Sequence, residues 1–237
     1  MLAGGIDGCR ACQESPGFFD VTDLLTAEAF APHQALAAQL LAHATEGDDG
    51  SHDLAHIHRV FRNAMRIQAG EGGDAEVLAA AVLLHDCVAV EKNSPLRSQA
   101  SRLAAEKASS ILADLGWPED RIARVAHAVL THSFSANIPP ETLEAKILQD
   151  ADRLDAIGMV GVARCFYIAG RLGSGLYHPG DPGADHRPLD DRLYAIDHFP
   201  AKLLKLSDGF QTATGRVLAE ERHQRLEQFL TLFRDEI

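Results

Sequence analysis

The sequence predicts an all-α fold, on three observations. Apolar residues run from Ala75 to Leu84 with no glycine or proline to interrupt them, which is the pattern of a buried helix. In most other segments the spacing of apolar residues also favours helices. No stretch of useful length alternates apolar and polar residues, as a half-buried strand would.

Capping residues, glycines and prolines set the expected helix boundaries. Ser51 is a candidate N-cap for a helix reaching about Gln68, and Gly70, Gly72 and Gly73 close that helix. A loop rich in glycine and proline is expected over 171–191, and loops of this length are usually functional or mobile. In chain order the expected helices span 22–30, 34–44, 51–68, 75–84, 96–115, 118–134 and 141–170, with two more in 193–237.

We expect one domain, because 237 residues suffice for a single sizeable core. Residues 21–237 would form it, with the motifs in about 48–160 and a C-terminal loop and helices in 171–237. Residues 1–20 contain several glycines and no helical period, which predicts a disordered tail. Cys9 and Cys12 within it have C-x-x-C spacing, but no second pair follows, which argues against a structural zinc site.

Composition narrows the function classes. The chain is 46% apolar and 24% charged, as a soluble globular protein is. Its net charge of -12 argues against duplex nucleic acid as a partner, because such binding relies on clustered lysine and arginine. A nucleotide stays compatible, since a metal ion and a few cations can hold phosphates in an acidic protein. Four cysteines, no long apolar segment and no signal peptide predict a cytoplasmic protein that does not bind membranes.

His85 and Asp86 stand side by side at the end of the apolar run, where the chain should still be buried. Neither side chain is commonly buried alone, because desolvating a charge costs several kcal/mol unless a hydrogen bond or a metal offsets it. A pair bonded to each other or to nearby backbone is the ordinary explanation. However, imidazole or carboxylate groups also lie among apolar residues in His52–Val60 and Leu148–Asp155. Such groups together suit divalent Mn, Fe, Co, Ni, Zn or Mg.

The order of these motifs resembles the HD-domain superfamily of metal-dependent phosphohydrolases. The resemblance rests on His56 in an H-x-x-R-V pattern, on the His85–Asp86 pair and on Asp150 further on. Four further segments look like the YedJ/YpgQ-like bacterial branch, namely Lys92–Asn93, His132–Ser135, Asp150–Leu154 and His186–Asp191. The resemblance implies an HD-domain helical bundle with an accessory C-terminal helical region.

The resemblance also implies one divalent metal ion held by His56, His85, Asp86 and Asp150. Apolar neighbours of Asp150 favour it over a merely charged helix surface. In binuclear members of the superfamily, additional histidines bind a second metal. Here His127 and His132 are five apart, about 140° around a helix, so they are poorly placed as a pair and one metal is favoured.

Further residues are candidates for substrate contact or catalysis. Asp86 would orient or deprotonate water, Lys92 would bind phosphate or be solvated, and His132 would be a phosphate contact or a proton donor. Arg153 would support Asp150 or clamp a phosphate. The complete set of predicted substrate contacts is His52, Arg59, Lys92, Arg97, His132, Arg153, His186 and Arg187.

The favoured function is a phosphohydrolase that uses metal-activated water on a nucleotide phosphoester or phosphoanhydride. Resemblance to the YedJ/YpgQ-like branch implies a nucleoside triphosphate or deoxynucleotide as substrate, with release of pyrophosphate. Two alternatives remain open, a 5'-nucleotidase acting on monophosphates and a non-catalytic sensor that binds nucleotide or metal. A small phosphorylated molecule is the expected partner, and a homodimer is a candidate assembly.

Overall fold

The computed structural model describes residues 26–45, 53–90, 97–133 and 136–237, and within these ranges every regular element is a helix. Extended pairing there is limited to one isolated bridge between Gly175 and Tyr194. The all-α prediction is therefore confirmed. The α-helices are α1 (Gln34–Leu40), α2 (Leu54–Glu71), α3 (Ala75–Leu84), α4 (Ala100–Asp114), α5 (Glu119–Thr131), α6 (Leu143–Asp155), α7 (Gly158–Leu172), α8 (His198–Ala201) and α9 (Ala213–Asp235). Short 3-10 helices are η2 (Ala27–Phe30), η3 (Leu41–His43), η4 (Arg97–Gln99), η6 (Ala195–Asp197) and η7 (Leu203–Lys205).

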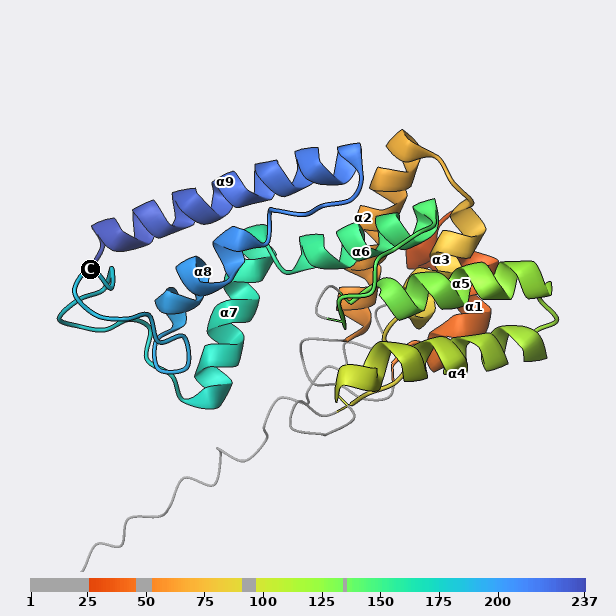
Figure 1. Ribbon diagram of the computed structural model, residues 1–237, viewed down its shortest axis with the longest axis horizontal. Coiled ribbons are helices and arrows are strands. Elements are labelled where there is room, and N and C mark those ends of the chain that lie inside the picture. Colours follow the sequence, from red (N-terminus) through yellow and green to blue (C-terminus); the bar gives the residue numbers. More distant parts are fainter. Residues whose placement is uncertain (1–25, 46–52, 91–96, 134–135) are drawn as a thin grey trace, which may run out of the picture.

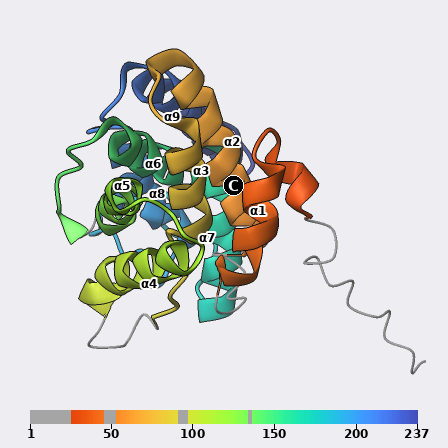
Figure 2. The same ribbon diagram turned by 90° about the vertical axis from the view of Figure 1, so that its right-hand side faces the viewer.

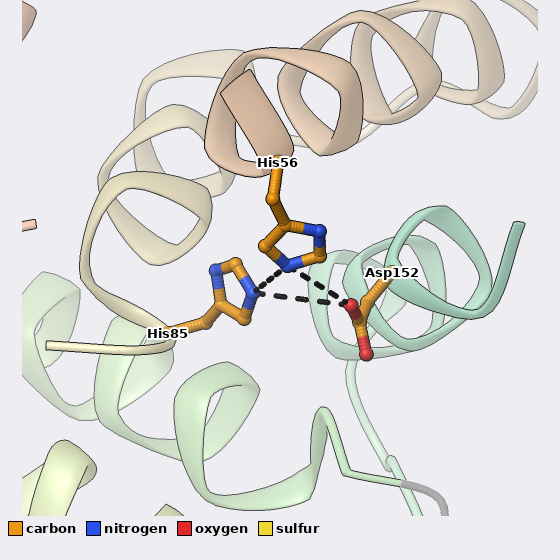
Figure 3. A group of neighbouring side chains, drawn as sticks. All are labelled: His56, His85 and Asp152. Atoms are coloured by element: carbon orange, nitrogen blue, oxygen red, sulfur yellow. Dashed lines mark hydrogen bonds and ion pairs between the residues drawn. The ribbon is translucent and has the colours of Figure 1, made fainter. Parts of the chain in front are cut away.

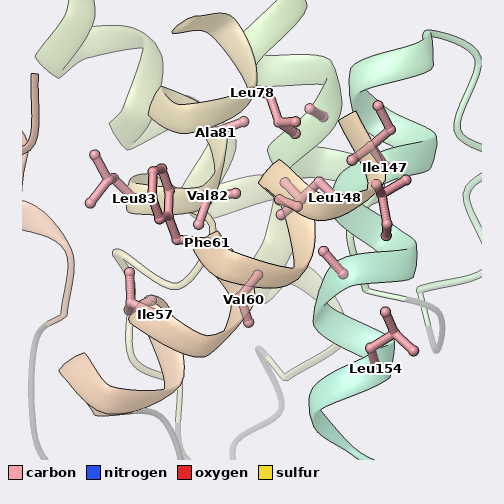
Figure 4. Close-up of a cluster of buried hydrophobic side chains, with 14 of the residues drawn as sticks. Ile57, Val60, Phe61, Leu78, Ala81, Val82, Leu83, Ile147, Leu148 and Leu154 are labelled. Atoms are coloured by element: carbon pink, nitrogen blue, oxygen red, sulfur yellow. The ribbon is translucent and has the colours of Figure 1, made fainter. Parts of the chain in front are cut away.

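Helix α3 lies at the centre of the bundle, between α1, α2, α5 and α6 (Figures 1 and 2). All of its residues from Val77 to Leu84 are fully buried, as the unbroken apolar run predicts. Leu83 packs in the same core as Phe61 of α2 and Leu148 of α6 (Figure 4). Burying an aliphatic or aromatic side chain of this size stabilises the fold by about 1.5–3 kcal/mol. The core therefore fixes the mutual positions of the three helices that carry the motif residues.

Aspartate side chains cap the N-termini of α2 and α3. Asp53 is the N-cap of α2 and accepts a hydrogen bond from the His56 backbone N–H at 2.8 Å, so the expected cap at Ser51 is corrected by two residues. Asp74 caps α3 by accepting from Glu76 and Val77. These bonds satisfy N–H groups that lack partners within the helix, and they fix where the first turn starts.

The expected continuous helix over 141–170 is two helices in the structure. Ile157 has extended backbone angles, and Gly158 follows with a φ of 71°, which side chains other than glycine adopt only with strain. The chain therefore turns after α6, and α7 leaves the central bundle at a steep angle (Figure 1). The sequence predicts one long helix because Ile157 and Gly158 do not interrupt the helical spacing of the apolar residues around them.

The C-terminal elements form an arm with its own aromatic core. Phe199 of α8 stacks on Phe229 of α9, with ring centroids 5.5 Å apart, and Phe166 of α7 packs at the edge of Phe229. Helix α9 runs from the ends of α2 and α6 along α7, so it joins the arm to the bundle (Figure 1). No helix in the described ranges has both the length and the apolar character needed to span a membrane.

Candidate metal centre

His56 lies in the first turn of α2, where the Asp53 cap holds the backbone. Its side chain is 1% exposed, and its Nδ1 lies 2.8 Å from the Asp155 carboxylate. With Nδ1–H donated to this carboxylate, the Nε2 atom on the other side of the ring faces His85 and Asp152 (Figure 3). Asp155 therefore sets the orientation of the His56 ring.

His85 and His132 occupy equivalent positions at the C-terminal ends of two helices. The Nδ1–H of His85 donates to the Val82 carbonyl at 2.7 Å, and that of His132 donates to the Val129 carbonyl at 2.6 Å. Each bond requires the proton on Nδ1, because a carbonyl oxygen only accepts. In the neutral tautomer with this proton, the lone pair is on Nε2 of each ring, which is the form that binds metals.

Three side chains from α2, α3 and α6 meet at one point (Figure 3). The Nε2 atoms of His56 and His85 are 3.3 Å apart, and Oδ1 of Asp152 is 3.5 Å from the first and 4.0 Å from the second. Ligand atoms about 2.1 Å from a common ion lie about 3.0–3.5 Å from one another. His56, His85 and Asp152 could therefore hold a divalent metal ion, with the ligand types that Mn, Fe, Co, Ni and Zn accept.

Asp86 lies against the same cluster. Its Oδ2 is 3.6 Å from Nε2 of His56 and 3.5 Å from Nε2 of His85, and its Oδ1 is 3.7 Å from Nε2 of His132. The Asp86 and Asp152 side chains are 25% and 30% exposed, whereas the imidazoles are buried. The cluster thus opens to solvent on its carboxylate side, where a small molecule can approach it.

Burial and neighbouring charges shift the pKa values of His56, His85 and Asp86 in different directions. Burial alone would lower the pKa of His56, but hydrogen bonds and charges from Asp155, Asp86 and Asp152 raise it to about 9. Burial lowers the pKa of His85, which keeps that ring neutral. Burial would raise the pKa of Asp86, but the charges and hydrogen bonds of the neighbouring imidazoles hold it well below its usual value. Asp86 therefore stays ionised, as a metal ligand must be.

A network behind His56 was not predicted from the sequence. Asp155 is 1% exposed and accepts from Nε and Nη2 of Arg59 at 2.7 and 3.0 Å, and from Nη1 of Arg164 at 2.9 Å. Burial would raise the pKa of Asp155, yet His56 and Arg59 hold it far below its ordinary value. Its position three residues after Asp152, on one helix face, was the available signal. Arg59, predicted to contact substrate, instead uses these two nitrogens to support the His56 partner.

The structure places Asp150, which the sequence predicts as a metal ligand, in contact with the start of α9 rather than in the cluster. Its carboxylate accepts from the backbone N–H groups of Gln211 and Thr212, both at 2.8 Å, and from the Thr212 hydroxyl at 2.7 Å. These groups begin α9, whose N-terminus attracts a negative charge. Asp150 thus anchors the C-terminal helix, and Asp152 takes the expected place in the cluster.

Arg153 also supports the chain before α9 rather than the cluster. Its Nε donates to the Leu206 carbonyl at 2.9 Å, its Nη2 donates to the Asp208 carbonyl, and its guanidinium lies over the Phe210 ring. Two of the three nitrogens of its guanidinium thus donate to backbone carbonyls rather than to a phosphate. Its charge is still felt at Asp150, where it opposes the rise in pKa that burial causes.

The predicted contacts in the 171–191 loop lie far from the cluster. Helix α7 runs away from α6 as far as Leu172, and the segment that follows lies at the remote end of α7 (Figure 1). Arg187 pairs there with Asp197 at 2.8 Å, and the His186 side chain is exposed. The structure therefore does not bring His186 and Arg187 to the metal centre.

The remaining predictions have mixed outcomes. His132 joins the cluster through Asp86, as described above. His52 and Lys92 lie outside the described residues, and so do the C-x-x-C pair and the N-terminal tail. Arg97 begins η4, and its side chain is outside the description. Cys87 and Cys165 are both buried.

Comparison with known proteins defines the class. The family model described as HD domain matches residues 53–157, which contain the entire cluster. The chain is 36% identical over 187 residues to the protein YpgQ of Bacillus subtilis, covering 77% of this chain and 83% of YpgQ. The chain belongs to the HD-domain family.

Particular relatives share the fold over most of their length. A crystal structure of an HD-superfamily hydrolase from Bacillus thuringiensis matches with a TM-score of 0.64 and 31% identity, covering 88% of this chain and 94% of that one. A crystal structure of B. subtilis YpgQ in complex with ADP matches with a TM-score of 0.63 and 33% identity, covering 91% of this chain and 97% of that one. The chain is thus an HD-domain protein related to YpgQ, and the superfamily supports a hydrolase as its class.

Proposed function

We propose that this protein is a metal-dependent phosphohydrolase that hydrolyses a nucleotide, with a nucleoside triphosphate as the favoured substrate and pyrophosphate as the favoured product. The observation that carries the proposal is the convergence of the His56 and His85 Nε2 atoms with the Asp86 and Asp152 carboxylates, on three helices far apart in sequence. The ADP complex of the related YpgQ supports a nucleotide as ligand.

His56, His85, Asp86 and Asp152 would hold the metal. A divalent ion bound there lowers the pKa of water and offsets charge on phosphate oxygens. The Nδ1 hydrogen bond of each imidazole already fixes its orientation, so the two side chains would lose little conformational freedom on binding a metal ion. One metal ion per site is the simplest stoichiometry, and the metal screen below would identify which metal supports activity.

The chain's own groups would direct the proton transfers. The Asp86 Oδ2 lies near His56 and His85, and its Oδ1 is 3.7 Å from Nε2 of His132. Asp86 can accept a hydrogen bond from the attacking water and orient it. His132 Nε2 would exchange a proton with a phosphate or leaving-group oxygen, because its Nδ1 is held by the Val129 carbonyl.

The test is a screen of metal-stripped protein reloaded with Mn, Co, Ni, Zn or Mg against nucleoside mono-, di- and triphosphates. Pyrophosphate among the products would support the favoured reaction, and orthophosphate from monophosphates would indicate a 5'-nucleotidase. His85→Ala and Asp86→Ala should abolish turnover. His127→Gln should retain turnover, because the His127 imidazole lies outside the cluster and accepts a hydrogen bond from the Glu141 backbone N–H. Nucleotide binding without turnover under every metal would refute the enzyme in favour of a sensor.

A further inference from the structure

A guanidinium from α9 binds the C-terminal end of α6. The last carbonyls of an α-helix have no partner within the helix, and α6 ends at Asp155. The Leu154 carbonyl accepts from Nη1 of Arg222, a residue 68 positions further along the chain. A positive charge is favourable at this end of a helix, because the helix dipole is negative there. Arg222 therefore caps α6 from a distant part of the sequence.

The same guanidinium also binds a buried asparagine of α2. Nη2 of Arg222 donates to Oδ1 of Asn63 at 2.8 Å, and Nδ2 of Asn63 donates to the Ala151 carbonyl of α6 at 3.1 Å. Asn63 is 8% exposed, and both polar atoms of its side chain are bonded. Loss of one member would leave buried polar groups unpaired, which is costly. One chain of hydrogen bonds thus joins α2, α6 and α9.

The two carbonyls in this network lie directly beside the acidic residues of the metal centre. Ala151 precedes Asp152, the carboxylate that meets the two imidazoles. Leu154 precedes Asp155, which orients the His56 ring. Because successive residues of an α-helix are related by a rotation of about 100°, holding one backbone carbonyl also sets the direction of the next side chain. The network therefore holds α6 in the rotation at which these carboxylates reach the cluster.

His56 and Asn63 lie on the same face of α2. They are seven residues apart, which is about two helical turns. His56 meets Asp155 and Asn63 meets Ala151, so α2 holds α6 at two points. A single point would leave α6 free to pivot, whereas two points define its rotation against α2. Asn63 thus adds the constraint that His56 alone does not provide.

Arg222 can reach α6 because the chain turns there at a glycine. A Cβ at Gly158 would lie 3.1 Å from Cγ and 3.2 Å from Cβ of Arg222, closer than carbon atoms ordinarily approach. The Arg222 stem therefore packs directly on the backbone between α6 and α7. Burial lowers the pKa of Arg222, and the nearby charge of Asp155 opposes that change. The break that redirects α7 thus also admits the guanidinium that caps α6.

We propose that Arg222 and Asn63 are positioning residues of the metal centre, which fix the rotation of α6 so that Asp152 and Asp155 meet His56. The inference rests on the proposed metal-dependent function and adds the residues that hold the acidic helix in place. Arg222 and Asn63 act through the backbone of α6, so their loss loosens the site without removing a ligand. The C-terminal arm is thereby coupled to a metal centre to which it contributes none of the proposed ligands.

The test measures Co²⁺ affinity and the Co²⁺ absorption spectrum in metal-stripped protein. The spectrum reports the geometry of the ligands and does not depend on turnover. Arg222→Met removes the guanidinium and keeps an apolar stem, so it should lower Co²⁺ affinity about tenfold and alter the spectrum. Asn63→Leu should have a similar effect. Arg222→Lys keeps the charge and one donor for the Leu154 carbonyl, so its affinity should lie between those of Arg222→Met and the unaltered protein.

Two controls on α9 separate positioning from loss of stability. Arg225→Met removes an arginine whose side chain is 54% exposed and 3.9 Å from Glu221, and it should change neither reading. Leu230→Ala truncates a side chain that is 6% exposed. It should unfold at a lower denaturant concentration yet keep the Co²⁺ affinity and spectrum when folded. Unaltered affinity and spectrum in Asn63→Leu, and in Arg222→Met where it folds, would overturn the inference. So would a loss of affinity in Leu230→Ala as large as in Asn63→Leu.

These readings are independent of catalysis. Loss of Co²⁺ affinity in Arg222→Met, in a protein that hydrolyses no nucleotide, would support the positioning role and refute the proposed function. Nucleotide turnover by a protein whose Co²⁺ affinity is the same in Arg222→Met and Asn63→Leu as in the unaltered chain would support the function and refute the positioning role. A protein that binds no Co²⁺ would refute both.

Discussion

Asp150 and Asp152 stand two residues apart on α6 and face different parts of the molecule. Two residues correspond to about 200° around an α-helix, so their carboxylates point to opposite sides. Asp152 reaches the imidazole cluster, with Oδ1 3.5 Å from Nε2 of His56. Asp150 accepts three hydrogen bonds at the start of α9. One helix thus builds the candidate metal centre and secures the C-terminal arm.

This division predicts opposite results for two matched substitutions. Asp152→Asn should lower metal affinity by at least the roughly 10–100-fold that loss of a supporting group costs, because a ligand charge is removed. Asp150→Asn should leave metal affinity intact and lower the free energy of unfolding by about 1–3 kcal/mol, because it disturbs buried hydrogen bonds. Metal titration of both variants measures the metal affinity, and denaturant unfolding measures the free energy of unfolding. The reverse pattern would restore Asp150 as the ligand.

Asp155 should act on the metal through His56. In Asp155→Asn the carboxylate that holds the His56 ring is replaced by a neutral amide, and Arg59 and Arg164 lose their charged partner. Loss of such a supporting group typically lowers metal affinity about 10–100-fold. Metal titration at a temperature where the variant is fully folded measures this effect apart from stability. Affinity equal to that of the unaltered protein would mean that the ring is positioned by packing alone.

The fold, and three of the four side chains that the structure brings together, could be predicted from the sequence, and the physical reasons differ by residue. His85 and Asp86 end an apolar run, so their burial and need for partners follow from local sequence. Asp150, Asp152 and Asp155 stand within six residues on one helix, and which of them faces His56 depends on how α6 is rotated against α2. That rotation is set by long-range packing of the core, which the spacing of acids does not reveal.

The difference between the predicted and observed C-terminal region has a related cause. A continuous helix through 157 and 158 would have kept the 171–191 loop in line with α6, whereas the break at Gly158 redirects α7. Arg187 then finds its partner within its own segment, at Asp197. A residue type suited to phosphate is therefore weak evidence for a substrate contact until the path of the chain is known.

The Arg187–Asp197 pair predicts a loss of stability in acid. Burial would raise the pKa of Asp197, but Arg187 and the Asp190 N–H lower it below the value of an unfolded aspartate. Because the folded-state pKa is depressed, this stability is present above about pH 4 and is lost as pH falls through the folded-state pKa. Thermal unfolding between pH 7 and pH 3 should show a shallower acid decline in Asp197→Asn than in the unaltered protein. Identical slopes would mean that this pair does not contribute.

Gly215 tests how closely α9 must approach Asp150. A Cβ at this position would meet the Asp150 Oδ2 and lie 2.6 Å from the Thr212 Oγ1, so Gly215→Ala forces the cap apart. Overpacking of this kind costs about 1–3 kcal/mol. Gly170→Ala is the matched control. A Cβ at this position of α7 would have no other atom within 4 Å, and the substitution removes a glycine from the helix. It should stabilise the protein by about 0.5–1 kcal/mol through the helix preference of alanine. Denaturant unfolding of both variants checks the pair, and a Gly215→Ala protein as stable as Gly170→Ala would contradict the close contact between α6 and α9.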